Sequence, residues 1–201
     1  MTTIAQVPEY HTYGLPVGTV RGFLSVLICS FFWIVLLYPT EVEQRVPLAH
    51  FFLLTMVFLA FASQPLSELR TQRFLPWLMR FIFVGGSLAV IAYVLYEDPQ
   101  RLPTRLTPNP DEISQWPALL ACLAGGFAAG LLLRFFLGRQ SPLFMTIRAW
   151  LGIIAILLLL FETLFQFIIL PNMSDKPSLD TLKVWEGVLI SVTAGYFGMR
   201  A

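Results

Sequence analysis

Two polar side chains, Glu162 and Gln166, interrupt the apolar stretch LLLLFETLFQFIIL at residues 157–170. An ionisable side chain near the middle of a bilayer costs about 3 kcal/mol on insertion scales, so it usually faces protein or water instead of lipid. Residues four apart share one helix face, and these two side chains could therefore hydrogen-bond to each other. We expect them to form a polar contact between helices, and a proton or cation relay is the functional alternative.

Few residues are candidates for enzymatic or cofactor chemistry. Catalysis needs a nucleophile, a base and an orienting group within reach of one another. The sequence has only two histidines, no metal-ligand cluster such as H-x-x-E-H and no glycine-rich phosphate loop. His50 could ligate a haem or chlorophyll through its imidazole. A site with two histidine ligands is harder to build, because His11 lies outside every apolar stretch and no apolar stretch contains a second histidine. We therefore expect no enzyme, metal or cofactor, and a structural or interfacial role for His50.

Small residues recur at helical spacing in the sequence GGFAAG. Gly126 and Gly130 form a small-xxx-small pair, and Gly125 with Ala129 repeats the spacing one residue earlier. Such faces let helix backbones approach closely, which matters in a membrane because lipid tails give helices no hydrophobic drive to associate. The motif predicts a packing face, whose neighbour is either another helix of the chain or a partner protein.

The composition is that of a membrane protein. Of 201 residues, 57% are hydrophobic and 12% are charged, about half the usual charged share. A span needs roughly 20 apolar residues. Such stretches occur at 22–39, 46–64, 77–96, 117–137 and 149–170, with a weaker one at 184–199.

The sequence therefore predicts an all-α, polytopic transmembrane bundle of about six spans without a soluble domain. The last stretch is short, rich in small residues and contains Glu186, so a re-entrant or interfacial segment is the alternative there. We expect residues 1–201 to form one integral membrane domain. Residues 1–20 lack a basic region and a cleavage site, which predicts a cytoplasmic segment before a retained first span.

The longest connection, residues 97–116, contains four prolines and several acidic residues. Proline favours extended and turn conformations, so an ordered external loop or short cap is expected. Cys29 and Cys122 both fall inside apolar stretches, where a free cysteine behaves as a small hydrophobe.

Basic residues divide unequally between the two sides of a six-span arrangement. The side of the N-terminus has eight arginines against two acidic residues, and the opposite side has five basic residues against eight acidic ones. Positively charged loops tend to stay in the cytoplasm. Both termini are therefore expected to be cytoplasmic.

Several stretches, taken in order, resemble a known family. QRVPLAHFFLLTMVFLAFASQP has a Gln-Arg pair, a histidine and a phenylalanine-rich end at proline, and PWLMRFIFVGGSLAVIAYVLYED runs from Pro-Trp to an aromatic-acidic end. Further similar stretches are LLLRFFLGRQSPLFMTI and WEGVLISVTAGYFG. Over residues 22–198 the pattern resembles the small (Q-type) membrane subunit of TRAP transporters of the TAXI type. The matching residues include Gln44, Arg45, His50, Phe61, Pro65, Tyr96, Glu97, Asp98, Arg105, Thr107, Pro108 and Asp111.

The resemblance implies a bacterial inner-membrane subunit that scaffolds a large permease subunit. That permease works with a periplasmic binding protein to import organic acids by ion-coupled symport. Nucleic acid is not among the expected partners. Phe135 stands where the family tends to have a second arginine, and Glu162 has no counterpart. Two other classes remain open: a structural or pigment- or haem-associated subunit of an energy-transducing complex, and a small homo-oligomeric channel with Glu162 and Gln166 at its pore.

Overall fold

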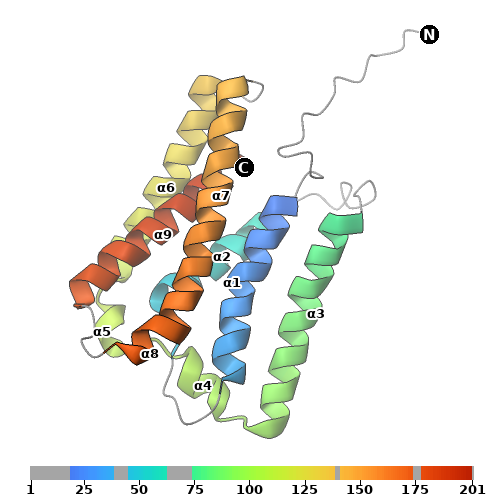
Figure 1. The fold of residues 1–201 in the computed structure, drawn as a ribbon, viewed down its shortest axis with the longest axis vertical. Helices are drawn as coiled ribbons and strands as arrows, with labels where there is room; N and C mark the ends of the chain where they lie inside the picture. The colour runs from blue at the N-terminus through green and yellow to red at the C-terminus, as the bar shows by residue number, and fades with distance from the viewer. Residues whose placement is uncertain (1–18, 39–44, 63–73, 139–140, 174–177, 201) are drawn as a thin grey trace.

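The computed structural model describes residues 19–38, 45–62, 74–138, 141–173 and 178–200, and all regular structure within these ranges is helical (Figure 1). The predicted all-α class is therefore confirmed for the described residues. The helices are α1 (Thr19–Leu37), α2 (Leu48–Ala62), α3 (Phe74–Glu97), α4 (Arg101–Leu106), α5 (Pro110–Ile113), α6 (Trp116–Leu137), α7 (Pro142–Leu164), the π-helix η3 (Phe165–Ile169), α8 (Leu170–Asn172) and α9 (Leu179–Arg200).

Four helical stretches in the described part of the chain are long and apolar enough to cross a membrane. They have 19 to 31 residues and high mean hydropathy. At 1.5 Å per residue, each is close to or longer than the roughly 30 Å of a hydrocarbon core. The chain is therefore a multi-pass membrane protein by helix length and hydropathy. The stretches are Thr19–Leu37, Trp77–Glu97, Trp116–Leu137 and Pro142–Asn172.

The prediction of about six spans is confirmed only for these four. The stretch 46–64 forms α2, whose 15 residues extend about 22 Å, less than a typical hydrocarbon core. The stretch 184–199 lies within α9, which has 22 residues but includes the charged Lys183 and Glu186 and is not among the apolar candidates. An apolar stretch in the sequence gives neither the length of the ordered helix nor its inclination.

The long helices run alternately between two ends of the molecule (Figure 1). The helices α1 and α3 begin at one end and pack side by side, and α6 ends and α7 begins toward the same end. The short helices α4, α5 and α8 gather at the opposite end. The helix α9 crosses α6 and α7 at an incline, and its C-terminus points toward the end where α1 begins. Which end faces the cytoplasm stays a prediction.

The core lies between α1, α2, α7 and α9, and α3 is attached at its edge. Fully buried apolar side chains come from all four core helices, for example Leu24, Ile28, Leu53, Ala155, Leu189 and Ile190. The joint between α1 and α3 depends on glycines that face bulky side chains. A methyl group at Gly22 would lie 2.9 Å from Cβ of Met79, and one at Gly86 would lie 2.7 Å from the Trp33 ring. The indole of Trp33 also donates a hydrogen bond to Ser87 Oγ at 3.2 Å.

Candidate functional site

The two polar residues of α7 lie in one hydrogen-bond network. Glu162 is 0% exposed, and its Oε1 accepts a hydrogen bond from Nε2 of Gln166 at 3.0 Å. Its Oε2 accepts a short hydrogen bond from the indole Nε1 of Trp185 on α9. The Trp185 ring also meets Phe161 edge-on, with ring centroids 5.3 Å apart. The carboxyl group therefore joins α7 to α9 and faces neither lipid nor an open channel.

No sequence pattern identifies Trp185 as the partner of Glu162. The two residues are separated by 23 positions, and Trp185 belongs to the helix with the weakest apolar signal. Gln166 itself lies in the π-helical turn Phe165–Ile169. Pro171 follows shortly after and cannot donate a backbone hydrogen bond to residue 167, which disturbs regular helical pairing there. That proline was the one local signal for an irregular turn.

A second carboxyl group lies near this network. Glu186 is 7% exposed on α9 and lies within electrostatic range of Glu112 and Glu162. Nevertheless, no three His, Cys, Asp or Glu side chains among the described residues come together in a group that could hold a metal ion.

The loop at 97–116 is ordered into α4 and α5, and its arginines cap α1. Arg105 is 5% exposed, and its Nη1 donates to the carbonyl oxygen of Val35 at 2.6 Å. Arg101 reaches the next carbonyl, that of Leu36, at 3.5 Å. The last carbonyls of a helix lack partners within it and form the negative end of its dipole, which favours cations. Burial lowers the pKa of Arg105, and the charge of Arg101 lowers it further.

The same loop caps the N-terminus of α2. Glu112 Oε2 accepts a hydrogen bond from the backbone N–H of Leu48 at 3.0 Å, and its Oε1 accepts one from Asn109 Nδ2 at 3.2 Å. The backbone N–H of Val46 also donates to the carbonyl of Arg105 at 3.0 Å. A negative charge suits a helix N-terminus, where backbone N–H groups are unpaired. Charged residues of the loop therefore hold the ends of α1 and α2.

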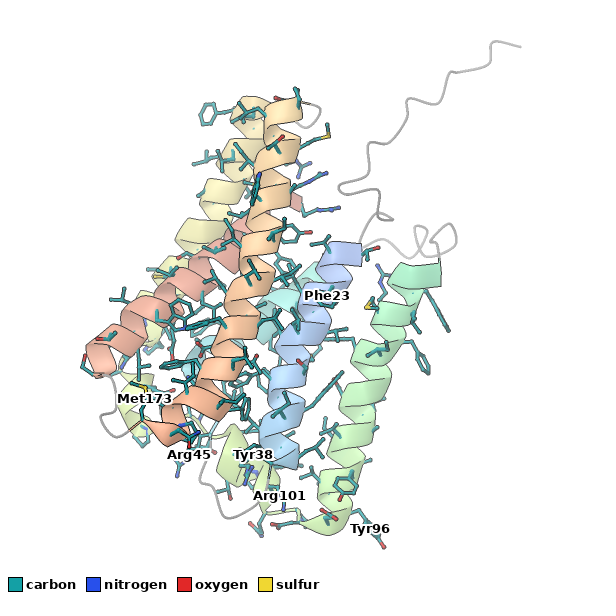
Figure 2. All side chains as sticks on the ribbon, in the orientation of Figure 1. Phe23, Tyr38, Arg45, Tyr96, Arg101 and Met173 are labelled. Atoms are coloured by element: carbon teal, nitrogen blue, oxygen red, sulfur yellow. The ribbon has the colours of Figure 1, made fainter. Side chains whose placement is uncertain are left out.

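Aromatic side chains mark this end of the molecule. Figure 2 shows Tyr38, Tyr96 and Arg101 at the end where α4 lies. Tyr96 is 91% exposed. Tyrosine and tryptophan are enriched at membrane–water interfaces, where the ring is apolar and the hydroxyl is wet. The arrangement fits an interfacial position for the turn that follows α3.

We expect Arg105→Ala to lower the free energy of unfolding by about 1–2 kcal/mol, because it removes a charged donor from the C-terminus of α1. Arg101→Ala is the matched control, since it removes the same charge from the same helix end but only a 3.5 Å contact. Unfolding of the detergent-solubilised protein by added SDS, followed by circular dichroism, measures both. Equal losses for the two variants would contradict a specific cap by Arg105.

The predicted glycine face divides into a packed pair and an exposed pair. Gly126 and Gly130 face α9, where a methyl group on either would collide with a backbone carbonyl, of Ser191 and Gly195 respectively. Gly125 has no atom within 4 Å of such a methyl group, and Ala129 is also exposed. Only one of the two offset pairs is therefore buried, and its neighbour is a helix of the same chain.

The helix α9 contributes small residues of its own to this contact. A methyl group at Gly198 would collide with the carbonyl oxygen of Phe127 and lie 3.1 Å from its carbonyl carbon. The hydroxyl of Ser191 donates to the backbone carbonyl of Cys122 at 3.2 Å. These contacts bring the two backbones together over several turns, and the spacing of small residues in α9 was the signal that could have identified its partner face.

His50, the candidate cofactor ligand, lies inside the core. It is 1% exposed and stacks on Phe31 with ring centroids 3.7 Å apart, while Phe32 meets it edge-on at 6.4 Å. Its Nδ1 has no hydrogen-bond partner among the described residues. The structure thus places His50 as a packed aromatic ring in the core, and cofactor binding by His50 stays a prediction.

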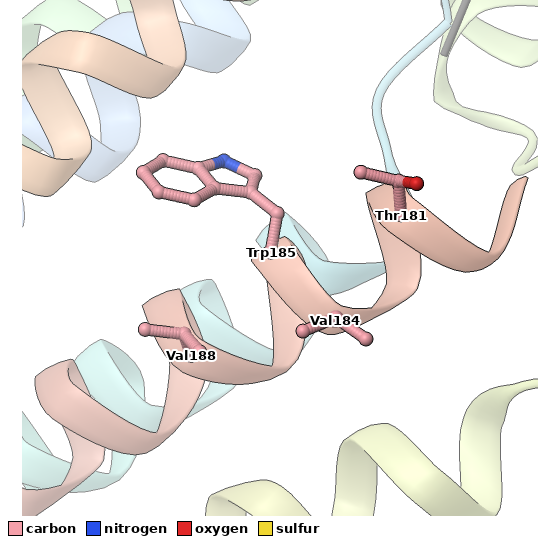
Figure 3. Close-up of a pocket in the computed structure, with 4 residues that line it drawn as sticks. All are labelled: Thr181, Val184, Trp185 and Val188. Carbon is pink, nitrogen blue, oxygen red and sulfur yellow. The ribbon is translucent and has the colours of Figure 1, made fainter. Parts of the chain in front are cut away.

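A depression on the surface of α9 is shallow and open (Figure 3). It is lined by Thr181, Val184, Trp185 and Val188, which follow one another along one side of the helix. Its lining has no charged side chain, and the indole N–H of Trp185 already donates to Glu162. A pocket for an organic acid would need convergent polar donors, which this depression does not provide.

Comparisons with known proteins identify no relative: no family model, curated protein or solved structure matches the chain. The fold therefore has to be described from its own helices. Of the residues that carry the likeness to the TAXI small subunits, Gln44 and Pro65 lie outside the described residues. The expected cytoplasmic segment at residues 1–20 lies outside them through residue 18. What the helices establish is a helical, multi-pass integral membrane protein.

Proposed function

We propose that this chain is a non-catalytic integral membrane subunit that scaffolds a large permease subunit in an ion-coupled, binding-protein-dependent importer of organic acids. The main support is that the buried polar side chains among the described residues bind other groups of the same chain. Glu162 binds Trp185 and Gln166, while Arg105 and Glu112 bind helix ends. These groups hold the chain's own helices together, which suits a scaffold better than a transport path.

The outer faces of the bundle also suit a scaffold. The helix α3 contacts α1 along one stripe and exposes much of its remaining apolar surface, including Phe81 and Leu88 at 62% and 63%. Phe135 and Phe136 at the end of α6 are 82% and 75% exposed. In a membrane such faces contact either lipid or the helices of a partner protein. Close van der Waals packing can stabilise a contact with partner helices. The identity of the partner comes from the resemblance of residues 22–198 to the small TAXI subunits.

Reconstitution tests the scaffold. The genes beside this one should encode a large multispanning permease and a secreted binding protein. We expect liposomes with all three proteins to take up an organic acid along an ion gradient. Liposomes that contain only this chain should neither bind nor transport it, because the depression on α9 has no charged side chain in its lining and the buried polar groups Glu162, Arg105 and Glu112 bind groups of the chain itself.

Two controls make the result decisive. Omission of this chain should abolish or strongly reduce uptake by the other two proteins, and should leave binding of the acid to the secreted protein unchanged. Uptake by this chain alone, or full uptake without it, contradicts the proposal. A homo-oligomeric channel would show itself as single-channel currents from the pure chain.

A further inference from the structure

Three helices meet around one aromatic ring at the end of the molecule where α1 begins. A methyl group at Gly152 of α7 would lie 3.1 Å from Cε2 of Tyr196 on α9 and 3.4 Å from Cγ1 of Val20 on α1. Cε2 is bonded to the carbon that carries the tyrosine hydroxyl. The hydroxyl end of Tyr196 therefore lies at the junction of α1, α7 and α9.

Two arginines lie one helical turn from this junction, on the same side of it. Arg148 precedes Gly152 by four residues and so shares its helix face. Arg200 follows Tyr196 by four residues, and its Cζ lies 6.0 Å from the centroid of the Tyr196 ring. Since α7 and α9 run in opposite directions, both steps lead toward the same end of the molecule (Figure 1). Both side chains are partly exposed.

Two polar atoms at the junction have no hydrogen-bond partner in the part of the chain that the structure describes. Tyr196 is 1% exposed, and neither its hydroxyl nor Nε of Arg200 has a hydrogen-bond partner among the described residues. Buried polar groups in folded proteins are nearly always hydrogen-bonded, so the unpaired hydroxyl of Tyr196 is available to a ligand's oxygen atoms. The guanidinium over the ring is also held by cation–π attraction, which fixes its position.

The charges at this end favour an anion. Arg21, Arg80, Arg134, Arg148 and Arg200 all lie in the halves of their helices nearest this end. The acidic residues whose side chains the structure describes lie toward the opposite end, and the nearest along α7 is Glu162, about 15 Å beyond Gly152. An anion at the junction therefore meets attraction from several arginines without a described carboxylate beside it.

We propose that the junction of α1, α7 and α9 binds the phosphate of an anionic phospholipid. Arg148 and Arg200 supply guanidinium donors, which match phosphate oxygens in pairs, and Tyr196 positions Arg200 and offers its hydroxyl. A lipid is favoured over a soluble anion because the junction lies beside the first turn of α1, a membrane-spanning helix, where headgroups lie. Basic pockets between transmembrane helices hold lipid headgroups in this way.

Lipid binding to the purified full-length protein tests the proposal, with phosphatidylglycerol as the anionic probe and phosphatidylcholine as the zwitterionic one. Native mass spectrometry from a neutral detergent measures the affinity for each. We expect tighter binding of phosphatidylglycerol, and a loss of about thirtyfold in that affinity in Arg148→Gln/Arg200→Gln, since each guanidinium that hydrogen-bonds the phosphate directly contributes roughly a factor of five.

The matched control is Arg80→Gln/Arg134→Gln, which removes the same charge from the same end on α3 and α6. It should lower the affinity less than threefold. Where the first double variant does not fold, Arg200→Lys keeps the charge but not the paired geometry and should bind about fivefold more weakly. Equal losses in both double variants, or no preference for the anionic lipid, would overturn the proposal. Displacement of the lipid by millimolar inorganic phosphate would assign the site to a soluble anion instead.

Discussion

Gly126→Leu should separate α6 from α9 and leave little folded protein. A single methyl group at this position would already collide with the carbonyl oxygen of Ser191 and lie 2.8 Å from its Cα. Because the obstruction is backbone, it cannot turn aside as a side chain would. Overpacking of this kind costs about 1–3 kcal/mol for small additions and more for large ones. We therefore expect Gly126→Ala to lower the free energy of unfolding by about 2 kcal/mol, measured by SDS titration in detergent.

The neighbouring Gly125 provides the matched control. It has the same residue type, helix and depth, but no atom within 4 Å of an added methyl group. Gly125→Ala and Gly125→Leu should therefore leave the unfolding midpoint unchanged or raise it slightly, because alanine and leucine favour helix more than glycine does. Gly130→Ala should behave like Gly126→Ala, since Met199 N would lie 2.9 Å from its methyl group. Similar midpoints for Gly125→Ala and Gly126→Ala would contradict the close packing of α6 and α9.

The glycine face shows how far the sequence could predict this fold. Spacing identified two pairs of small residues one position apart, and each pair lies on its own face of the helix. Which face is buried depends on where α9 crosses α6, and that is set by contacts about 70 residues apart, such as Ser191 with Cys122. A single sequence has no local signal for such a crossing.

The spans and caps have the same limit. Apolar composition predicted the four long helices, because burial in lipid requires a continuous apolar stretch. The described helix within the stretch 46–64 is α2, with 15 residues, and the end of that stretch lies outside the described residues. The prolines of the loop at 97–116 predicted an ordered loop or short cap, but they did not indicate that Arg105 and Glu112 bind the ends of α1 and α2. The helix ends attract these charges through space, and the periodicity of the sequence does not indicate which charges lie near which helix end.

Glu162→Leu should destabilise the contact between α7 and α9, whereas Glu162→Gln should be tolerated. Leucine leaves the indole N–H of Trp185 and the amide of Gln166 without their acceptor. An unpaired buried donor costs about 1–3 kcal/mol in soluble proteins, and hydrogen bonds between membrane helices average about 0.6 kcal/mol. We expect a total loss of about 2 kcal/mol. Glutamine can still accept from Trp185 through its oxygen, and Gln166 can turn its amide to accept from the new N–H.

Trp185→Phe separates the hydrogen bond from the packing, because phenylalanine keeps an aromatic ring near Phe161 but has no N–H. If Glu162 and Trp185 act as one unit, Glu162→Leu/Trp185→Phe should cost less than the sum of the two single changes, and the difference measures their coupling. Additive losses would contradict the bridge. A relay would behave differently from polar glue: Glu162→Gln would assemble with its partners and lose transport, because the amide cannot exchange a proton as a carboxyl group does. We expect the assembled Glu162→Gln complex to transport fully. The hydrogen bond from Trp185 needs an acceptor at position 162, but it does not need a side chain there that gains and loses a proton.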